Sequence, residues 1–295
     1  MKILIVTQYF WPENFKITDL AKGLSDRGHE ITVLTGKPNY PIGKLYPGYR
    51  VLGVQKERHG DISIIRTPLI PRGRSKVSLA LNYVSFALTA TLLAGFKSFK
   101  PEIIFVYGPS PVTACLPAIF LKKQNKVPLL FWVQDLWPES VVAVNALKNR
   151  LMLRLLHKLV YFIYKHCDQI LSSSLAYFSS IKKFDIADEK LKYFPQTADK
   201  SYRPIEPHVC DEEDRLLPKG FRILFSGNLG IAQDLPFILN AAERLKHETE
   251  IKWIFIGDGS KRVWLQNQIL KRQLTKTVFW LGAYPSIKMP YFFRW

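Results

Sequence analysis

The chain has 295 residues, which suits two domains, and its 47% hydrophobic content excludes a disordered protein. Lys and Arg outnumber Asp and Glu by 42 to 24, so the formal net charge of +18 predicts an anionic partner: a nucleic acid, an anionic membrane surface or a phosphorylated ligand. The three cysteines, Cys115, Cys167 and Cys210, show neither a disulfide framework nor metal-ligand spacing, so we expect a reducing compartment and no bound metal.

The first 35 residues predict a β-α-β unit. Short apolar runs at 3–7 and 31–35 are typical of buried strands, and apolar residues recur at helical spacing between 17 and 24. Gly28 is a typical helix-ending residue. The apolar run that opens the chain is too short for a signal peptide, so we expect a protein that is not exported.

Strands and helices continue to alternate up to residue 203, which predicts a doubly wound α/β domain with a parallel sheet covered on both faces. The expected strands are 62–66, 103–106, 129–133, 169–171 and 191–194, and the expected helices are 77–96, 111–123 and 147–166. Three prolines and an acidic run predict a linker over 204–220. A second domain over 221–295 has expected strands at 221–226, 251–256 and 278–281 and expected helices at 235–245 and 260–272.

The second domain holds only three β-α units, whereas a doubly wound domain carries about five or six strands. The last residues, 292–295, are mostly aromatic and form no polar tail. We therefore expect a partial C-terminal domain in a truncated form of the protein.

The first glycine-rich loop of the second domain contains Gly227, Asn228 and Gly230, with Gln233 at the start of the next helix. Glycines let backbone amides approach a ligand closely, and the start of a helix supplies a positive dipole end, which together suit a diphosphate. A plain β-α turn is the alternative. The loop matches neither a dinucleotide-binding nor a Walker pattern.

The second glycine-rich loop contains Gly257, Asp258 and Gly259 and follows the next strand. Both loops are expected at the carboxyl edge of a parallel sheet, where α/β proteins bind ligands. This loop is also compatible with a plain turn.

In the first domain, residues 132–140 run from the end of a predicted strand into the next loop and read Trp-Val-Gln-Asp-Leu-Trp-Pro-Glu-Ser. Carboxylates accept hydrogen bonds from sugar hydroxyls, and tryptophan rings pack on the C–H faces of sugars. Asp135 and Glu139 are therefore the candidate catalytic residues. In the alternative interpretation, Glu139 caps the next helix and the tryptophans belong to the core.

The loop after the first strand contains Phe10, Trp11, Glu13 and Asn14. Its three consecutive aromatic residues, 9–11, cannot all be buried in one direction, so we expect some of them to line a cleft. A purely structural role is the alternative.

Residues 77–96 are uncharged and have the length of a transmembrane helix, within a segment, 62–101, that contains no Asp or Glu. Five Ser, Thr and Asn residues interrupt this stretch, and basic residues lie on both sides of it. Three interpretations stay open: a buried core helix, a helix in the membrane interface, and a true span.

The predicted helix 147–166 carries leucines on one face and Arg150, Arg154 and Lys158 on another, with no acid from Ser140 to Cys167. Such a helix predicts contact with an anionic membrane surface, although a solvated basic face fits equally well. Nucleic acid is disfavoured, because no nucleic-acid-binding motif accompanies the charge.

Taken in order, these segments resemble the bacterial family 4 glycosyltransferases. The resemblance covers essentially the whole chain and rests on MKILIVTQYFWPEN (1–14), DLAKGLSDRGHEITVLTGKPNYP (19–41), QDLWPES (134–140), SGNLGIAQDL (226–235), IGDGS (256–260) and LGAYPSIKMPYFF (281–293). The most similar subgroup builds colanic acid and O-antigen and includes fucosamine transferase-like enzymes.

The resemblance implies a GT-B fold, in which the first of two facing Rossmann-like domains binds the acceptor and the second binds a nucleotide-sugar donor. It implies a glycosyltransferase of surface polysaccharide synthesis that needs no cofactor and no obligatory metal. The acceptor would be a polyprenyl-diphosphate-linked sugar. A cytoplasmic protein, peripheral on the inner face of the inner membrane, is therefore expected.

The resemblance also implies residue roles. Gly227, Asn228 and Gly230 would hold the donor diphosphate, with Gln233 beside them, and Gly257, Asp258 and Gly259 would line the donor cleft. Phe10, Trp11, Glu13 and Asn14 would lie on the acceptor side. Asp135 would lie near the reacting sugar.

The sequence departs from the family in two places. Asn228 and Gln233 stand where many members carry Arg and Lys, and the family's Glu-x(7)-Glu motif is absent from the 295 residues. We therefore expect weak or no activity in this form. The competing hypothesis is a non-catalytic membrane-surface-binding fragment or a pseudogene product.

Overall fold

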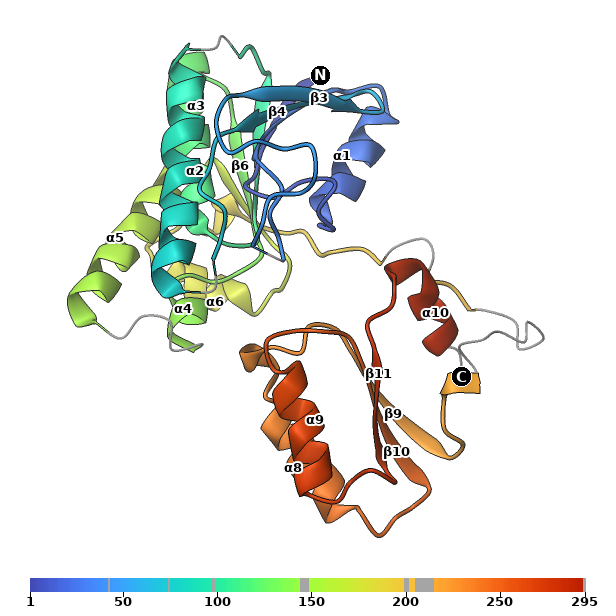
Figure 1. The fold of residues 1–295 in the computed structure, drawn as a ribbon. Coiled ribbons are helices and arrows are strands. Elements are labelled where there is room, and N and C mark those ends of the chain that lie inside the picture. Colours follow the sequence, from blue (N-terminus) through green and yellow to red (C-terminus); the bar gives the residue numbers. More distant parts are fainter. Residues whose placement is uncertain are drawn as a thin grey trace. The chain divides into compact units, whose positions relative to one another are not determined.

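A computed structural model describes residues 1–41, 43–73, 75–96, 99–143, 149–198, 202–204 and 215–293. The chain divides into two compact units, Met1–Gln196 and Thr197–Trp295, each with its own sheet (Figure 1). The predicted domain limits at 203 and 221 stay predictions, because residues 205–214 of the expected linker lie outside the described residues.

Unit 1 is built on an eight-stranded sheet with the order β3-β4-β2-β1-β5-β6-β7-β8. Its strands are β1 (Lys2–Val6), β2 (Glu30–Gly36), β3 (Gln55–His59), β4 (Ile62–Thr67), β5 (Ile103–Gly108), β6 (Leu129–Val133), β7 (Gln169–Ser172) and β8 (Leu191–Tyr193). All neighbours are parallel except β3, which pairs antiparallel with β4. β3 has no counterpart among the predicted strands, because its polar sequence, Gln-Lys-Glu-Arg-His, lacks an apolar pattern and is tolerated only at a sheet edge.

Helices cover both faces of this sheet (Figure 1). One face carries α1 (Ile17–Ser25), and the other carries α2 (Lys76–Phe96), α3 (Leu116–Asn125) and α5 (Arg150–His166). Alternate side chains of β1 enter different cores: Ile3 and Ile5 pack with α1, whereas Leu4 and Val6 lie under α2, α3 and α5. This explains why the strands are continuously apolar.

Shorter helical segments complete unit 1: η1 (Val112–Cys115), α4 (Glu139–Ala143), α6 (Tyr177–Lys182) and η2 (Asp188–Lys190). The predicted helix 77–96 agrees with α2 to within one residue. α5 begins after Asn149, whose side chain accepts hydrogen bonds from the backbone N–H groups of Leu151 and Met152. Residues 147 and 148, where that helix is predicted to begin, lie outside the described residues.

Unit 2 contains a three-stranded parallel sheet in the order β11-β10-β9, made of β9 (Phe221–Ser226), β10 (Ile251–Ile256) and β11 (Val278–Gly282). Its helices are η3 (Ile231–Gln233), α8 (Leu235–Arg244), α9 (Arg262–Lys271), η4 (Ser286–Lys288) and α10 (Met289–Phe292). Leu235, Leu239 and Leu265 bury α8 and α9 against one face of the sheet. Leu217, Met289 and Phe292 form a smaller core with Ile254 and Ile256.

Candidate active site

Buried amide side chains hold together the loops at the carboxyl edge of the unit 1 sheet. Gln8, which follows β1, donates from Nε2 to Oδ1 of Asn82 on α2 at 2.6 Å. Asn82 in turn donates from Nδ2 to the Ile70 carbonyl oxygen at 2.7 Å, and Oδ1 of Asn39 accepts from the backbone N–H of Arg72 at 2.9 Å. Because buried amides are costly unless they are bonded, this chain of contacts fixes the loops after β1, β2 and β4 against α2.

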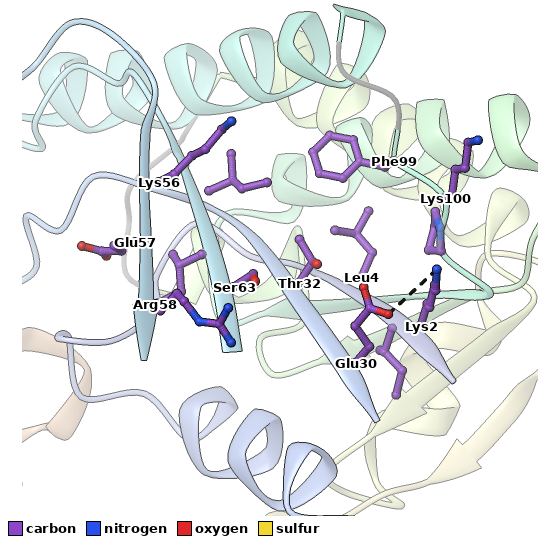
Figure 2. A pocket seen from close by; sticks show the side chains of 14 residues that line it. Lys2, Leu4, Glu30, Thr32, Lys56, Glu57, Arg58, Ser63, Phe99 and Lys100 are labelled. Atoms are coloured by element: carbon purple, nitrogen blue, oxygen red, sulfur yellow. Dashed lines mark ion pairs between the residues drawn. The ribbon is translucent and has the colours of Figure 1, made fainter. Parts of the chain in front are cut away.

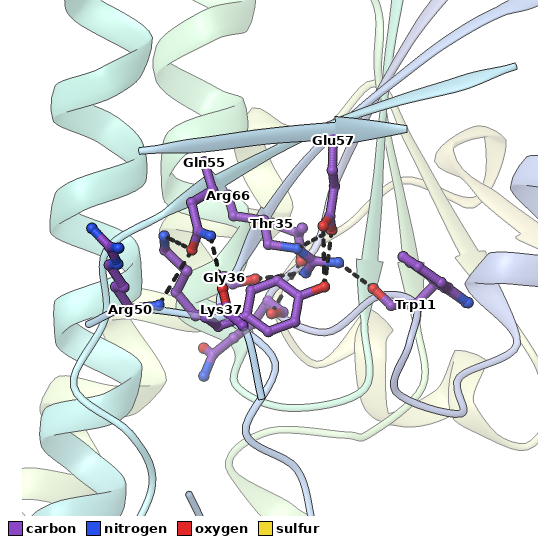
Figure 3. Close-up of polar contacts among 11 residues, drawn as sticks. Trp11, Thr35, Gly36, Lys37, Arg50, Gln55, Glu57 and Arg66 are labelled. Atoms are coloured by element: carbon purple, nitrogen blue, oxygen red, sulfur yellow. Dashed lines mark hydrogen bonds and ion pairs between the residues drawn. The ribbon is translucent and has the colours of Figure 1, made fainter. Parts of the chain in front are cut away.

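A second polar cluster, centred on Arg66, supports the first of these loops (Figure 3). The guanidinium group is fully buried, pairs with Glu57 and donates to the carbonyl oxygens of Gly36, at 2.9 Å, and Trp11. The Tyr49 hydroxyl donates to Glu57, and its ring lies 5.1 Å from the Arg66 guanidinium carbon. Arg66 therefore positions the Trp11 loop and has no accessible donor left for a ligand.

Glu13 is buried beneath the loop that follows β2. Its Oε1 accepts hydrogen bonds from the backbone N–H groups of Asn39, at 2.8 Å, and Tyr40, at 2.7 Å. Burial raises the pKa of Glu13 to about 7, although these two bonds and the charge of Arg66 favour the ionised form. Glu13 thus holds the β2 loop in place and titrates near neutral pH.

The structure separates the four predicted acceptor-side residues. Phe10 is fully buried in the core on the α1 face, and Glu13 is buried as described. Trp11 is half-buried and stacks on His59, with 4.5 Å between ring centroids, whereas Asn14 is exposed. Phe10 and Glu13 are placed to position the loop, and Trp11 and Asn14 are placed to meet a ligand; both roles stay predictions.

Asp135 follows β6 at the same edge. It is accessible from solvent, yet the surrounding protein raises the pKa of its carboxyl group to about 6 through partial burial. Burial raises the pKa of the Tyr83 hydroxyl and raises that of Tyr107 to about 12, and the charge of Asp135 adds to both increases. The ring centroids of Tyr83 and Trp137 lie 6.3 Å apart. This edge therefore combines the Asp135 carboxylate, two tyrosine hydroxyls and an indole ring, which are groups that bind sugars.

The rest of the 132–140 segment divides between core and surface. Trp132 is buried, and its Nε1 donates to the Phe194 carbonyl oxygen at 3.0 Å. Glu139 is exposed in the first turn of α4, where a negative charge interacts favourably with the helix dipole. Nε2 of Gln134 is buried and, among the described residues, has no hydrogen-bond partner. An unsatisfied donor next to Asp135 suits a bound ligand or water.

Arg72 is a site residue that the sequence analysis does not single out. Its guanidinium carbon lies 4.8 Å from the centre of the Tyr40 ring, and within the described part of the chain it forms no ion pair. Its charge opposes the raised pKa of Tyr83, which shows that the two groups lie near each other. Its sequence context is weak: Arg72 is one of several basic residues in the acid-free segment 62–101 and lies five residues after the end of β4.

In unit 2, the two glycine-rich loops lie side by side at the ends of β9 and β10. The backbone N–H of Leu229 donates to the Asp258 carbonyl oxygen at 2.9 Å, and that of Lys261 donates to the Leu229 carbonyl oxygen at 2.8 Å. Asn228 and Asp258 are exposed, and among the described residues their backbone N–H groups donate to no protein acceptor. Two accessible amides on adjacent loops suit an anionic group.

Close approach of the two loops explains their glycines. Gly257 has φ +144°, and a Cβ on it would lie 1.8 Å from the Gly227 carbonyl oxygen. A Cβ on Gly259 would lie 2.5 Å from the Leu229 carbonyl oxygen of the first loop, so a larger residue at Gly257 or Gly259 would separate the loops. A Cβ on Gly230 would instead lie 2.6 Å from the side-chain amide of Asn228 in its own loop.

The remaining loop residues support this arrangement. Oε1 of Gln233 accepts from the backbone N–H of Gly230 at 3.1 Å, so this side chain stabilises the loop. Asp258 forms an ion pair with Arg262 at 3.3 Å. Lys261 lies 5.3 Å from the Trp264 ring centre and forms no ion pair within the described residues. Two basic residues thus follow the second loop: Arg262 is paired with Asp258, whereas Lys261 has no acidic partner among the described residues.

A hollow of about 480 Å³ lies at the opposite, amino end of the unit 1 strands (Figure 2). It is lined by Lys2, Ile3, Leu4, Glu30, Thr32, Lys56, Glu57, Arg58, Ser63, Ile64, Ile65, Phe99, Lys100 and Pro101. Lys2 and Glu30 form an ion pair across part of it, at 3.9 Å. Because parallel α/β sheets bind ligands at their carboxyl ends, we place the candidate site at the other edge.

The described residues contain no group of three or more His, Cys, Asp or Glu side chains that could hold a metal ion. Cys115 and Cys167 are buried free thiols, and Cys210 lies outside the described residues.

The predicted membrane-surface residues Arg150, Arg154 and Lys158 are all exposed on α5, and they form no ion pair in the described part of the chain. Among the described residues, α2 is the one helix that is long and apolar enough to cross a membrane by length and composition. One face of α2 is nonetheless buried against the sheet.

Comparison with known families identifies the chain. Residues 15–195 match the glycosyl transferase 4-like domain, and residues 211–294 match the glycosyl transferases group 1 domain. The chain belongs to the glycosyl transferase 4-like family. It is a glycosyltransferase by family, as the resemblance predicts.

Individual relatives agree with this assignment. The chain is 26% identical over 308 residues to WcaI of Escherichia coli K12, named as a colanic acid biosynthesis glycosyl transferase, with 97% of this chain and 73% of that protein covered. Among solved structures, Anabaena HepE in complex with UDP gives a TM-score of 0.63 at 14% identity over 98% of this chain and 71% of that one. The catalytic domain of Arabidopsis thaliana starch synthase IV, bound to ADP and acarbose, gives 0.60 at 10% identity, covering 98% and 75%.

The structural likeness confirms the predicted GT-B fold, with a second domain that is shorter than the first. In this glycosyltransferase, unit 1 corresponds to the 4-like domain and unit 2 to the group 1 domain.

Proposed function

We propose that this glycosyltransferase moves a sugar from a nucleotide-sugar to a polyprenyl-diphosphate-linked acceptor in the synthesis of a surface polysaccharide of the colanic-acid type. The observation that carries the proposal is the pair of glycine loops, 227–230 and 257–259, on adjacent parallel strands of unit 2. The similarity to WcaI, and the UDP and UDP-glucose named for Anabaena HepE, support the reaction class and the donor class.

The donor diphosphate would bind at these loops. The free amides of Asn228 and Asp258 would donate hydrogen bonds to phosphate oxygens, and the ammonium group of Lys261 would offset their charge. Lys261 would thereby supply a positive charge that many family members carry on the first loop.

The acceptor sugar would bind at the carboxyl edge of unit 1. Trp137 and Tyr83 would contact it, and Asp135 would accept a hydrogen bond from the attacking hydroxyl. The hydroxyl oxygen then forms a bond to C1 of the donor sugar while the bond from C1 to the diphosphate oxygen breaks. The hydroxyl proton passes to Asp135 or to the leaving diphosphate. A carboxylate with a pKa of about 6 can accept a proton near neutral pH.

A lipid-linked acceptor is embedded in a membrane, so the enzyme that uses it has to work at the membrane surface. We propose that the protein is cytoplasmic and peripheral on the inner face of the inner membrane, supported by the exposed row Arg150, Arg154 and Lys158 on α5.

The donor proposal is tested by the thermal midpoint of the chain with UDP-, GDP- and dTDP-sugars, because a ligand that binds only the native state raises the midpoint. We expect one nucleotide class to raise it. Lys261→Ala should weaken that binding about tenfold through loss of a charge-assisted contact. Lys271→Ala, at the far end of α9, is the matched control and should bind like the unaltered chain. Equal binding by both variants would remove Lys261 from the donor site.

The competing hypothesis is a membrane-surface-binding protein without catalysis, favoured by the apolar outer face of α2. Turnover of a nucleotide-sugar with a lipid-linked acceptor, measured on this 295-residue chain, separates the two functions. The same assay tests the expectation that activity in this form is weak or absent.

A further inference from the structure

Helix α2 has two dissimilar faces. Phe86, Ala90 and Ala94 on one face belong to the main core of unit 1, and Asn82 bonds to the carboxyl-edge loops. The opposite face exposes six large apolar side chains, here called the apolar stripe: Val77, Leu81, Val84, Leu88, Leu92 and Phe96. Their spacing of three or four residues keeps them on one side of the helix.

The apolar stripe is long and strongly exposed. Leu88 and Leu92 are each 60% exposed and Phe96 is 89% exposed. The stripe follows the 21-residue helix from end to end, a length of about 30 Å at 1.5 Å per residue. Contiguous apolar surface of this extent marks a contact with another molecule or a membrane.

The buried face of α2 argues against a span. Only 28% of its most apolar 18-residue window is buried, yet that part includes Phe86 and Ala90, which close the core over the sheet. Crossing a bilayer would remove this cover from the strands and separate Asn82 from its partners. The helix is therefore suited to lie along an apolar boundary and not to pass through it.

Charge indicates which boundary fits. The segment from Ile62 to Pro101 contains no acidic residue. α5, in the same helical layer as α2 (Figure 1), exposes Leu151, Leu155 and Phe162. It also exposes its basic row, Arg150, Arg154 and Lys158, which forms no ion pair with any residue that the structure describes. Apolar side chains combined with unpaired cations complement an anionic bilayer, where each basic residue contributes about 1 kcal/mol.

We propose that the apolar stripe of α2 inserts into the interfacial region of an anionic bilayer while the basic row of α5 contacts the lipid headgroups. Delivery of a lipid-linked acceptor by this surface rests on the proposed function, whereas binding of the surface to a bilayer does not. Asn82 and Tyr83 face the carboxyl edge from the same helix, and Arg72 lies on the loop before it. A single helix therefore joins the bilayer to the acceptor site, and a lipid-linked acceptor reaches that site without leaving the membrane.

The test is flotation of the full chain with vesicles of phosphatidylethanolamine and phosphatidylglycerol. The double variant Leu88→Gln/Leu92→Gln removes the centre of the stripe. The matched control is Phe237→Gln/Leu270→Gln, which replaces two side chains of unit 2 that are 71% and 66% exposed. We expect the control to float like the unaltered chain and the stripe variant to bind at least about tenfold more weakly, because it no longer buries two leucines.

A second variant tests the electrostatic part. Arg154→Gln/Lys158→Gln should weaken binding to the anionic vesicles about tenfold and leave the much weaker binding to phosphatidylcholine vesicles unchanged. Thermal midpoints of all variants should stay close to that of the unaltered chain, since the substituted side chains are exposed.

Three results would overturn the proposal. The first is equal flotation of the stripe variant and the control, and the second is resistance of the bound chain to alkaline extraction, which would indicate a span. The third is a dimer that the stripe variant loses, without vesicle binding, which would make a second copy the occupant. None of these measurements needs donor or acceptor, so a failure of the proposed reaction is recognised separately, by absent transfer to a detergent-solubilised acceptor.

Discussion

Two arginines six residues apart, Arg66 and Arg72, have opposite surroundings. Arg66 on β4 is fully buried, and Glu57, Gly36, Trp11 and the Tyr49 ring surround its guanidinium group (Figure 3). Arg72 is half-exposed over the Tyr40 ring and has no acidic partner among the described residues. Both follow from one stretch of sequence that contains no acid.

This contrast shows how polar groups divide between a structural role and ligand binding. A buried cation must be bonded within the protein, so Arg66 and its partners stabilise the loops that they join. A cation without a partner at the carboxyl edge of a parallel sheet is available to an anionic ligand. The Asp135 carboxylate and Nε2 of Gln134 likewise have no hydrogen-bond partner among the described residues, whereas Glu13 is bonded within the protein as Arg66 is.

The largest expected effect of the contrast is on stability. Arg66→Met should lower the free energy of unfolding by roughly 3–5 kcal/mol, because it leaves Glu57 and two carbonyl oxygens without their partner. Arg72→Met should change it by less than about 0.5 kcal/mol. Urea unfolding of both variants measures the difference, and equal losses would show that Arg72 is also structural.

The next largest effect is expected on activity, at the accessible carboxylate of Asp135. Asp135→Asn should lower kcat about a hundredfold, because a neutral amide cannot accept the hydroxyl proton. Since ionised Asp135 is required, kcat/KM of the unaltered chain should rise with pH through about 6. Glu139→Gln is the matched comparison on the exposed start of α4, and a larger loss there would transfer the role to Glu139.

Glu13 offers a pH test of a buried carboxylate. Its pKa of about 7 in the folded chain exceeds the ordinary 4.5, so the native state holds its proton more tightly than the unfolded state does. Stability should therefore fall as pH rises from about 4.5 to about 7. Glu13→Gln lacks this titration, and its stability relative to the unaltered chain should increase by about 3 kcal/mol between pH 4.5 and pH 8, since one pKa unit corresponds to about 1.4 kcal/mol. A difference that does not vary with pH would contradict the raised pKa.

Within the Arg66 cluster, a smaller effect is expected at Tyr49. Tyr49→Phe keeps the ring over Arg66 and removes the hydroxyl bond to Glu57, so unfolding should become easier by about 1 kcal/mol. Thermal unfolding of Tyr49→Phe, compared with that of Arg66→Met and of the unaltered chain, measures this loss of stability. A loss as large as that of Arg66→Met would mean that the hydroxyl and not the cation holds the cluster.

Local pattern was sufficient for much of the fold. Apolar runs in 3–7, 31–35 and 129–133 predicted strands β1, β2 and β6, because a strand covered on both faces is apolar throughout. The polar strand β3 carries no such pattern, since its pairing with β4 supplies the stability that its side chains do not. Edge strands of this kind are therefore recognised only from their partners.

The candidate site divides in the same way. The two glycine loops were predicted from sequence, because tight turns need glycine locally. The sequence did not indicate that Phe10 and Glu13 are buried beneath their loop, or that Arg72 and Lys261 stand next to the candidate sites. Whether a polar side chain is bonded depends on residues far away in the chain, such as Asn82 for Gln8.

Periodicity and glycine placement are local properties, so they were enough to predict the alternation of strands and helices and the positions of the loops after them. The family followed from the order of the motifs along the chain. The covered face of α2 and the pairing of Arg66 but not Arg72 could be seen only in the folded chain. Those outcomes depend on which strands and helices pack together, because packing brings Asn82 into contact with Gln8, 74 positions away in the chain, and with Asn39, 43 positions away.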